Sequence, residues 1–302
     1  MNCIVCNSDK KTRLFKNTED YEYGTYRNVN FSECQKCNLI FQDPLPPKEI
    51  IGSFYPENYR NYISDNGSLF SVLKKLQFKT LAKKILSKVN NNDKYIKILD
   101  VGFGNGELLL ALKEKGYKNL YGTDFSNKNF ERLKKKEINI ELSDVEECLP
   151  FKEEFDAIIM NHVIEHFLDP VRVLKNCLER LKTNGKLILL TPNTNALEYS
   201  IFKKYWAGLH IPRHTFIFND KNIKQLGETL GFRMIKICAV SDPGQWSISL
   251  QNVLQSFSFS KVNLKNGMAW YSVPVSAVFI PITLLQSIIG KSTSIMCIFS
   301  KN

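Results

Sequence analysis

The chain has 302 residues, of which 43% are hydrophobic, and it carries a formal net charge of +11. These values are ordinary for a globular protein with one main domain and smaller attachments. The start of the sequence lacks an apolar signal segment, which argues against secretion and predicts a cytoplasmic protein. The positive charge comes from basic residues spread widely over the sequence, so it gives little support to a nucleic-acid partner.

Two C-x2-C pairs near the N-terminus are the first feature with a clear chemical meaning. Cys3 and Cys6 form one pair, and Cys34 and Cys37 form the other. Together they present four thiolates, the ligand set of a structural zinc ion, and the residues between them predict the strands of a zinc ribbon over 1–47. Four protein ligands close the metal shell, so we expect no catalysis there. Unligated thiols or a redox pair are the alternatives.

Residues 48–94 are predicted to form a linker and cap helices. Prolines at 44, 46 and 47 mark the linker, and a tyrosine-rich stretch over 54–59 follows. Between 69 and 88, apolar residues recur at helical spacing with lysines on the other face, which predicts an amphipathic helix or helix pair. This helix could cover an active site or pack on a sheet, and packing is the simpler interpretation.

From residue 95 onward the predicted strands and helices alternate. Asp169 and Pro170 mark the start of one of these helices. The alternation predicts a domain over 95–302 of the doubly wound α/β class with a mainly parallel sheet. Strands are expected at 97–101, 120–124, 138–142, 155–160, 186–191, 232–240 and 294–300, and helices at 108–115, 128–136, 170–181 and 220–229.

A glycine-rich turn directly follows the first of these strands. Gly102, Gly104 and Gly106 alternate with other residues before a helix begins, and a ligand can lie against such a backbone because glycine has no Cβ. Asp124 ends the second strand, where a carboxylate can accept hydrogen bonds from both hydroxyls of a ribose; helix capping is its alternative role. Glu107 stands where a dinucleotide site requires a small residue, so a nicotinamide cofactor is disfavoured.

Four segments resemble, in order and spacing, the motifs of the class I S-adenosylmethionine-dependent methyltransferases. They are ILDVGFGNGE at 98–107, LYGTDFS at 120–126, SDVE at 143–146 and FDAIIMNHVIEH at 155–166. The resemblance implies a Rossmann-like, seven-stranded sheet and S-adenosylmethionine as the cofactor. It places the glycines along the methionine part, Asp100 near the ammonium, Asp124 on the ribose and Asp144 on the adenine amino group. The cofactor-binding residues that it implies are Asp100, Gly102, Phe103, Gly104, Gly106, Asp124, Phe125, Asp144, Val145 and Asn161.

The N-terminal features resemble those of a bacterial subgroup of this family that carries a zinc-binding N-terminus. The shared features are the paired cysteines, the proline-rich link and the tyrosine-rich stretch. The subgroup includes sugar C-methyltransferases and relatives from surface-polysaccharide gene clusters. The resemblance implies a sugar, a nucleotide sugar, or a polysaccharide or lipid-linked precursor as the acceptor, methylated on carbon or oxygen. The chain departs from the sugar C-methyltransferases in being too short for their extra C-terminal domain.

All four histidines of the chain lie between residues 162 and 214. The two segments that hold them follow predicted strands, so both are expected at the carboxyl edge of the sheet. Because a methyl acceptor must lose a proton, a general base is expected there, and histidine titrates in the right range. His162 is the first candidate, His166 and His214 follow, and Glu165 is expected to orient a histidine.

Two further readings of these segments stay open. Residues 162–166 have the pattern H-x-x-E-H of a peptidase zinc site, but that pattern requires a helix and here it directly follows a strand. Some quinone-pathway O-methyltransferases resemble this segment and hold a divalent metal there, but they have an acid where this chain has His162. A catalytic metal is therefore the less favoured alternative. Arg213 is a candidate for holding an anionic group of the acceptor.

Residues 241–291 are predicted to be an insertion before the last strand. Residues 266–290 carry no charge, and 273–289 are apolar enough to raise the question of a membrane span. Two prolines and several polar residues in this stretch argue against a span. Packing in the core is the simplest expectation. An apolar lid, or a peripheral contact of 266–290 with the inner face of a membrane that holds a lipid-linked acceptor, is the alternative.

The sequence therefore predicts a cytoplasmic, S-adenosylmethionine-dependent methyltransferase that acts on a small molecule. A zinc-ribbon RNA methyltransferase is one alternative, but the segment after the fourth strand lacks the Pro-Pro-aromatic turn typical of base-amino methylation. A catalytically silent module that binds the cofactor is another, and the intact glycine turn and Asp124 disfavour it. The sequence does not determine the oligomeric state.

Overall fold

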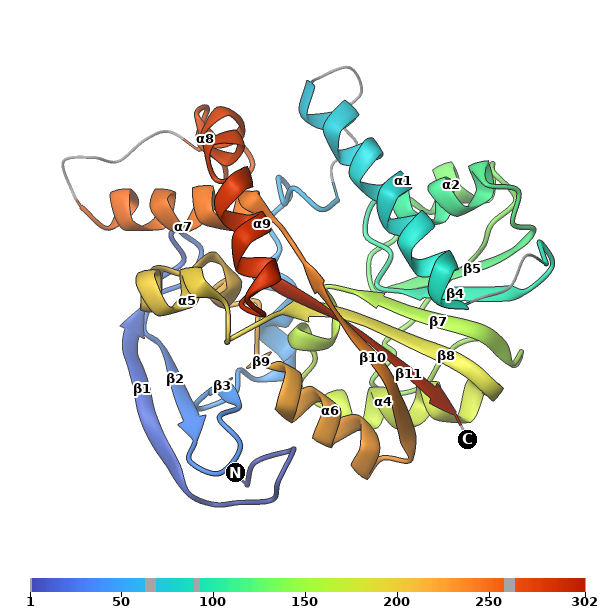
Figure 1. Ribbon diagram of the computed structural model, residues 1–302, viewed down its shortest axis with the longest axis horizontal. Helices are drawn as coiled ribbons and strands as arrows, with labels where there is room; N and C mark the ends of the chain where they lie inside the picture. Colours follow the sequence, from blue (N-terminus) through green and yellow to red (C-terminus); the bar gives the residue numbers. More distant parts are fainter. Residues whose placement is uncertain (1, 63–68, 90–92, 258–263, 302) are drawn as a thin grey trace.

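A seven-stranded sheet forms the centre of the protein in a computed structural model, which describes residues 2–62, 69–89, 93–257 and 264–301 (Figure 1). The strand order is β10-β11-β8-β7-β4-β5-β6, and only β11 runs antiparallel to its neighbours. This confirms the expected doubly wound class. The strands are β4 (Lys97–Val101), β5 (Asn119–Asp124), β6 (Asn139–Leu142), β7 (Phe155–Asn161), β8 (Leu181–Pro192), β10 (Phe232–Val240) and β11 (Ser294–Lys301).

Helices cover both faces of this sheet (Figure 1). One face packs against α1 (Leu69–Val89), α2 (Glu107–Glu114) and α3 (Phe130–Lys134). The other packs against α4 (Pro170–Arg180) and α6 (Asp220–Thr229). Successive residues of β4 alternate between the two apolar clusters, because side chains of a strand point to opposite faces. The prediction that the amphipathic helix packs on the sheet is confirmed for the C-terminal half of α1, where Ala82 and Ile85 are buried.

One predicted boundary was wrong, between α4 and the strand that follows. The side chain of Asp169 caps α4 by accepting a hydrogen bond from the backbone of Arg172, as expected. However, α4 ends at Arg180 and β8 begins at once at Leu181, so that the Asn184-Gly185 pair lies within the strand instead of before it. Asn184 has a φ of +61°, a conformation that asparagine tolerates better than most residues, and it lies in a bulge: Leu181 pairs with Phe155 and the pairing resumes at Lys186 opposite Ala157.

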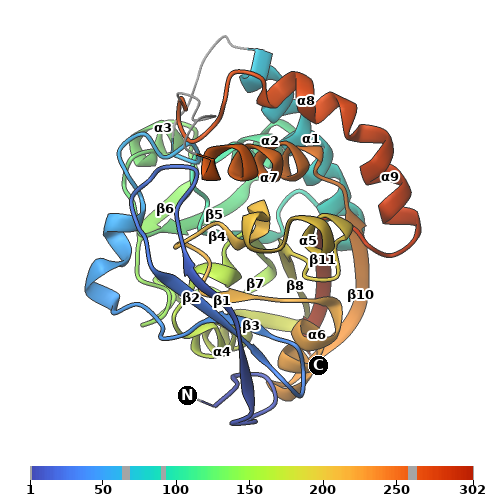
Figure 2. The same ribbon diagram turned by 90° about the vertical axis from the view of Figure 1, so that its left-hand side faces the viewer.

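The N-terminal residues form a second, four-stranded sheet (Figure 2). β1 (Lys11–Thr18), β2 (Val29–Cys34) and β3 (Ile40–Gln42) pair in sequence, and β3 also pairs with β9 (Phe216–Ile217) from the second half of the chain. The side-chain amide of Gln42 adds a hydrogen bond of 2.8 Å to the carbonyl of His214. The expected ribbon over 1–47 is therefore completed by a strand of the larger domain. A turn of 3-10 helix, η1 (Lys48–Phe54), and the tyrosine-rich stretch lie along the chain between this N-terminal sheet and the larger domain.

The predicted insertion before β11 consists of α7 (Pro243–Ser256), α8 (Ser272–Val278) and α9 (Ile280–Ile288); residues 258–263 within it lie outside the described residues. The helix α9 buries its polar residues Thr283 and Gln286 and exposes apolar ones. Gln286 accepts a hydrogen bond from Trp246 Nε1 and donates to Glu198, a residue of α5 (Leu197–Phe202). Core packing was thus the wrong expectation for the apolar side of α9. Among the described residues, no helix is both long and apolar enough to cross a membrane.

Candidate active site

The glycine-rich turn lies at the topological switch point, where the order in which strands are added to the sheet reverses. β4 pairs with β5 on one side and with β7 on the other, and ligands of doubly wound sheets bind at the carboxyl ends of strands at such a point. Gly102, Gly104 and Gly106 all have φ between +56° and +74°. A Cβ on Gly102 would lie 2.6 Å from Val163, the second residue after β7, so the two strand ends are packed closely. The positive φ and the packing against Val163 both require glycine at position 102.

Two buried carboxylates lie beside this turn. Asp124 Oδ2 accepts a hydrogen bond of 2.8 Å from Gly104 N, and Oδ1 accepts one of 2.9 Å from Ser126 N. Burial raises the pKa of Asp124 to about 6. Burial, reinforced by the charge of Asp124, raises the pKa of Asp100 well above its usual range. Asp100 Oδ1 makes no hydrogen bond to any described atom, so a cationic ligand group would satisfy it.

The tyrosine-rich stretch runs across the glycine turn and was missed as part of the site. A Cβ on Gly104 would lie 3.2 Å from the carbonyl oxygen of Asn61. The ring of Tyr55 lies 5.3 Å from that of Phe125, and Phe125 also contacts Tyr62 edge-on. The sequence signal was the cluster of tyrosines itself, whose place in space could not be read from its composition. Phe103 is buried beneath the turn against Phe130.

The remaining predicted cofactor residues lie at the rim of the same edge. Asp144 is partly exposed, and its Oδ2 forms an ion pair of 2.7 Å with Lys48 of η1. Val145 is buried in the core, and Asn161 is the last residue of β7. The structure therefore brings the ten predicted residues to one edge, although Asp144 already has a cationic partner there.

The first predicted base and its orienting acid are in contact. His162 lies just after β7 with a φ of +57°, and its Nδ1 is 3.3 Å from Oε1 of Glu165 in η2 (Ile164–His166). Burial alone would lower the pKa of His162, but the adjacent carboxylate more than offsets it and the net shift is upward. Burial likewise opposes ionisation of Glu165, yet the surrounding histidines bring its pKa down to about 2. The pair can hold and release a proton at a partly exposed position.

The other three histidines form a compact group behind Glu165. The rings of His166 and His214 are 4.6 Å apart, and those of His210 and His214 are 5.0 Å apart. Burial lowers the pKa of His166, lowers that of His214 to about 3, and places that of His210 well below its usual range. His210 and His214 are buried, so an acceptor can reach their rings less easily than it can reach His162.

Arg213 does not have the predicted role. Its side chain is fully buried, pairs with Asp20 at 3.0 Å and stacks over the ring of Tyr23 at 4.5 Å. The guanidinium therefore fastens the N-terminal segment to the larger domain and is not free for an anionic acceptor. A second ion pair, between Arg60 and the buried Glu22 at 3.1 Å, connects the N-terminal segment to the end of the tyrosine-rich linker.

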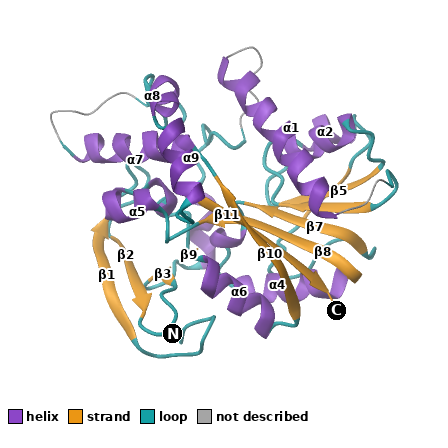
Figure 3. Ribbon diagram, in the orientation of Figure 1, coloured by secondary structure: helices purple, strands orange, loops and turns teal. Residues whose placement is uncertain are grey.

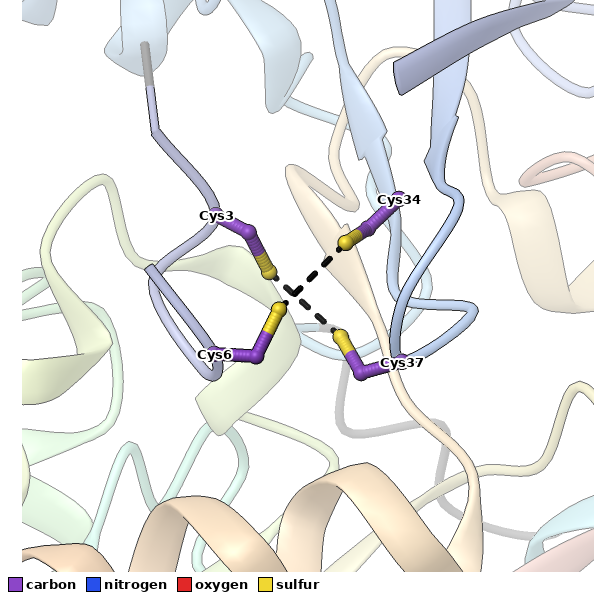
Figure 4. A group of neighbouring side chains, drawn as sticks. All are labelled: Cys3, Cys6, Cys34 and Cys37. Atoms are coloured by element: carbon purple, nitrogen blue, oxygen red, sulfur yellow. Dashed lines mark hydrogen bonds between the residues drawn. The ribbon is translucent and has the colours of Figure 1, made fainter. Parts of the chain in front are cut away.

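The four N-terminal cysteines converge on a common centre (Figure 4). One sulfur atom of each lies within 4.8 Å of the others; the Cys3 and Cys37 sulfurs are 3.4 Å apart and those of Cys6 and Cys34 are 3.5 Å apart. Interaction with Cys37 lowers the pKa of Cys3 to about 5. Four sulfurs at this spacing fit a tetrahedral zinc ion. The cluster lies against the main apolar core, in contact with residues such as Phe41.

Comparisons with known proteins agree with this geometry. A family profile described as "Methyltransferase domain" matches residues 73–237. A ubiquinone biosynthesis O-methyltransferase of Coxiella burnetii is 30% identical over 155 residues, which is 47% of this chain and 66% of that protein. A demethylmenaquinone methyltransferase of Thermotoga maritima is 33% identical over 120 residues, 37% of this chain and 52% of that protein. The chain thus spans less than two thirds of either relative.

Solved structures share the fold. A SAM-dependent methyltransferase from Archaeoglobus fulgidus superposes with a TM-score of 0.51 at 20% identity, covering 78% of this chain and 100% of that one. The PH0226 protein from Pyrococcus horikoshii superposes with a TM-score of 0.52 at 16% identity, covering 81% of this chain and 96% of that one.

Proposed function

Because this chain belongs to the methyltransferase domain family, we propose that it transfers the methyl group of S-adenosylmethionine to a small-molecule acceptor. The observation that carries this proposal is the pairing of two features at one edge of the sheet. One is a glycine turn beside two buried carboxylates, of which Asp100 has an oxygen without a hydrogen bond, and the other is the His162–Glu165 pair at the adjacent strand end.

The carboxylates fit the cofactor. The unpaired Oδ1 of Asp100 suits the ammonium of the methionine part, and the remaining lone pairs of Asp124 suit the ribose hydroxyls. The ring of Phe125 is half exposed beside Asp124 and can stack on an adenine. When bound, S-adenosylmethionine supplies an electrophilic sulfonium methyl group. The adenine role of Asp144 requires its carboxylate to bind in competition with Lys48.

The His162–Glu165 pair handles the proton of the acceptor. Neutral His162 accepts the proton as the acceptor atom attacks, and the buried carboxylate of Glu165 stabilises the imidazolium that results. Glu165 lies beside Nδ1 and so leaves Nε2 of the partly exposed ring as the nitrogen that can accept this proton. Correct alignment of the two reacting atoms contributes the rest of the rate. This arrangement favours an acceptor hydroxyl or an acidic C–H, because a neutral amine has a lone pair and needs no base before attack.

For the acceptor we propose a sugar, a nucleotide sugar or a polysaccharide or lipid-linked precursor. The paired cysteines and the tyrosine-rich stretch, by which the chain resembles the subgroup that includes sugar C-methyltransferases, support this choice. A phenolic quinone precursor is the second candidate, and the names of the relatives support it. Purified protein with methyl-labelled S-adenosylmethionine should label one of the two compound sets. Labelling of nucleotide sugars supports the first, and labelling of polyprenyl phenols replaces it with the second.

Labelling of neither set, together with binding of the cofactor, would identify a silent cofactor-binding module. Labelling of transcripts with a salt-dependent affinity would instead identify an RNA methyltransferase. No binding of S-adenosylmethionine or its demethylated product by calorimetry would contradict the proposed function as a whole.

We also propose that the cysteine cluster binds a structural zinc ion and that α9 makes a peripheral contact with a membrane. The outer side of α9 exposes Leu284, Leu285 and Ile288, while its inner side is fixed by the polar network around Gln286. A helix that buries polar groups and exposes leucines is matched to an apolar environment. Such a contact would bring a cytoplasmic enzyme to a lipid-linked acceptor.

Vesicle flotation tests this contact. The protein should float with anionic phospholipid vesicles, and the double substitution Leu285→Glu with Ile288→Glu should abolish flotation. Leu142→Glu provides the control, because Leu142 is as exposed as Leu285 but lies on β6 at the other end of the sheet. Flotation that persists in the double variant, or that is lost equally in the control, rules out α9 as the contact.

A further inference from the structure

Three histidines outside the proposed catalytic pair are arranged as a ligand set. His166 lies in η2, and His210 and His214 lie in the loop that leads to β9. One nitrogen of each ring lies within 4.8 Å of the others. Imidazole nitrogens at the 2.0–2.1 Å bond lengths of a tetrahedral zinc ion are about 3.4 Å apart, so small rotations of the rings close the cluster on an ion. The rings meet edge to face, with interplanar angles of 78–86°.

The hydrogen bonds of two of these rings fix the tautomer that binds metals. Nδ1 of His166 lies 3.0 Å from the carbonyl oxygen of Arg213, and Nδ1 of His214 lies 2.8 Å from that of Gly208. A carbonyl can only accept, so a proton on each Nδ1 satisfies both contacts and leaves each Nε2 with a free lone pair; the Tyr55 hydroxyl oxygen, 3.1 Å from Nδ1 of His166, can accept from the same N–H. Donation of the second ring N–H to a backbone carbonyl is the usual outer-shell arrangement of a metal-bound histidine.

Buried negative charge surrounds the cluster. Oε1 of Glu165 lies 3.8 Å from Nε2 of His214, and Oε2 of Glu22 lies 3.8 Å from Nε2 of His210. Both glutamates are buried, and neither Glu22 Oε2 nor either carboxylate oxygen of Glu165 has a hydrogen bond within the part of the chain that the structure describes. A metal ion on the imidazoles would share these carboxylates with Arg60, which lies 3.1 Å from Glu22 Oε2, and with His162, which lies 3.3 Å from Glu165 Oε1.

We propose that His166, His210 and His214 bind one divalent transition-metal ion of the zinc type, distinct from the ion of the cysteine cluster. Imidazole is a ligand that such ions prefer, and three ligands leave a fourth position for water. The ion joins the loop after β7 to the loop before β9 and so fixes the wall behind Glu165. A small pocket lined by Glu19, Asp20 and Glu22 borders His210. This site does not depend on the methyl acceptor.

Metal analysis of the purified full chain by mass spectrometry tests the proposal. We expect two ions per chain in the wild type and one in His210→Phe, which keeps a ring stacked on Tyr59 but removes the ligand nitrogen. His162→Phe is the matched control: it removes a nearby histidine outside the cluster and should retain two ions. Equal metal content in wild type and a folded His210→Phe overturns the proposal.

A second measurement on the wild type decides the matter if His210→Phe does not fold. An organomercurial that attacks thiolates should release the cysteine-bound ion, detected with a zinc dye, and leave one ion that appears only on denaturation. Release of all metal by the mercurial means that the histidine cluster holds none and overturns the proposal. Neither result bears on cofactor binding, so failure here is separate from failure of the proposed methyl transfer.

Discussion

Nδ1 of His162 lies 3.3 Å from Oε1 of Glu165, and the carboxylate is fully buried whereas the ring is partly exposed. The negative charge of Glu165 is therefore shielded from solvent, whereas the ring of His162 is open to contact with an acceptor. It follows β7 directly, next to Val163, whose side chain packs on the glycine turn. The residue proposed to take the proton, His162, is therefore the neighbour in sequence of Val163, which packs on the proposed cofactor site.

The substitution His162→Gln tests the base. It should lower kcat by about 10²–10⁴-fold, because proton removal from the acceptor loses its catalyst. The affinity for S-adenosylmethionine, measured by calorimetry, should stay the same, since the packing against Gly102 is made by the side chain of Val163 and is kept in the variant. A variant with the kcat of the wild type would remove His162 from the mechanism.

Asp124→Asn tests the ribose contact. Loss of hydrogen bonds to a charged acceptor costs about 1.5–3 kcal/mol, so the Kd for S-adenosylmethionine should rise roughly tenfold to a hundredfold. Asp156→Asn is the control, because Asp156 lies near the opposite end of β7, paired with Lys182. Equal affinity of the Asp124 variant and wild type would contradict the assignment.

The pH dependence of cofactor binding follows from the same residue. Burial raises the pKa of Asp124 to about 6, so the carboxylate is ionised above that pH and protonated below it. Ribose hydroxyls donate to the ionised form, and binding therefore favours it. Affinity should be full at pH 7.5 and fall as the pH drops through 6, as measured by titrations from pH 5 to 8. In Asp124→Asn this step should disappear; an unchanged step would assign the titration to another group.

Cys34→Ser tests the zinc of the N-terminal cluster. The variant should lose one ion per chain and become less stable on the order of 4 kcal/mol, because loss of a metal that holds the β1–β3 sheet to the core is among the most damaging changes. Cys148→Ser is the control, since Cys148 is an exposed cysteine outside the cluster. A folded Cys34→Ser protein with unchanged metal content would mean that the thiolates bind none.

Gly102→Ala tests the packing of the turn. Its Cβ would lie 2.6 Å from Val163, whereas a Cβ on Gly24, which has nearly the same φ, would meet nothing within 4 Å. Both alanines bear the strain of a positive φ, about 1–2 kcal/mol, but only Gly102→Ala adds an overlap of about 1–3 kcal/mol. Urea unfolding should show this difference, and adding Val163→Ala should reduce it. Equal losses in both variants would show that the backbone alone requires glycine at 102.

The sequence by itself determined the features that depend on local patterns. The alternation of strands and helices, the turn around Gly104 and the cap at Asp169 are set by neighbouring residues, so periodicity and spacing predicted them. The carboxyl edge of the sheet followed from parallel pairing, which brings the ends of β4, β5 and β7 together. Most of the candidate cofactor residues could therefore be found without coordinates.

Only the tertiary structure decided which distant segments meet. It placed Asn61 against Gly104, buried Arg213 against Asp20, and turned the apolar side of α9 outward. It also brought His210 and His214 to His166, more than forty residues earlier in the chain. Such contacts depend on how whole elements pack and which polar groups they satisfy, and a pattern with the period of one helix or strand carries no information about that.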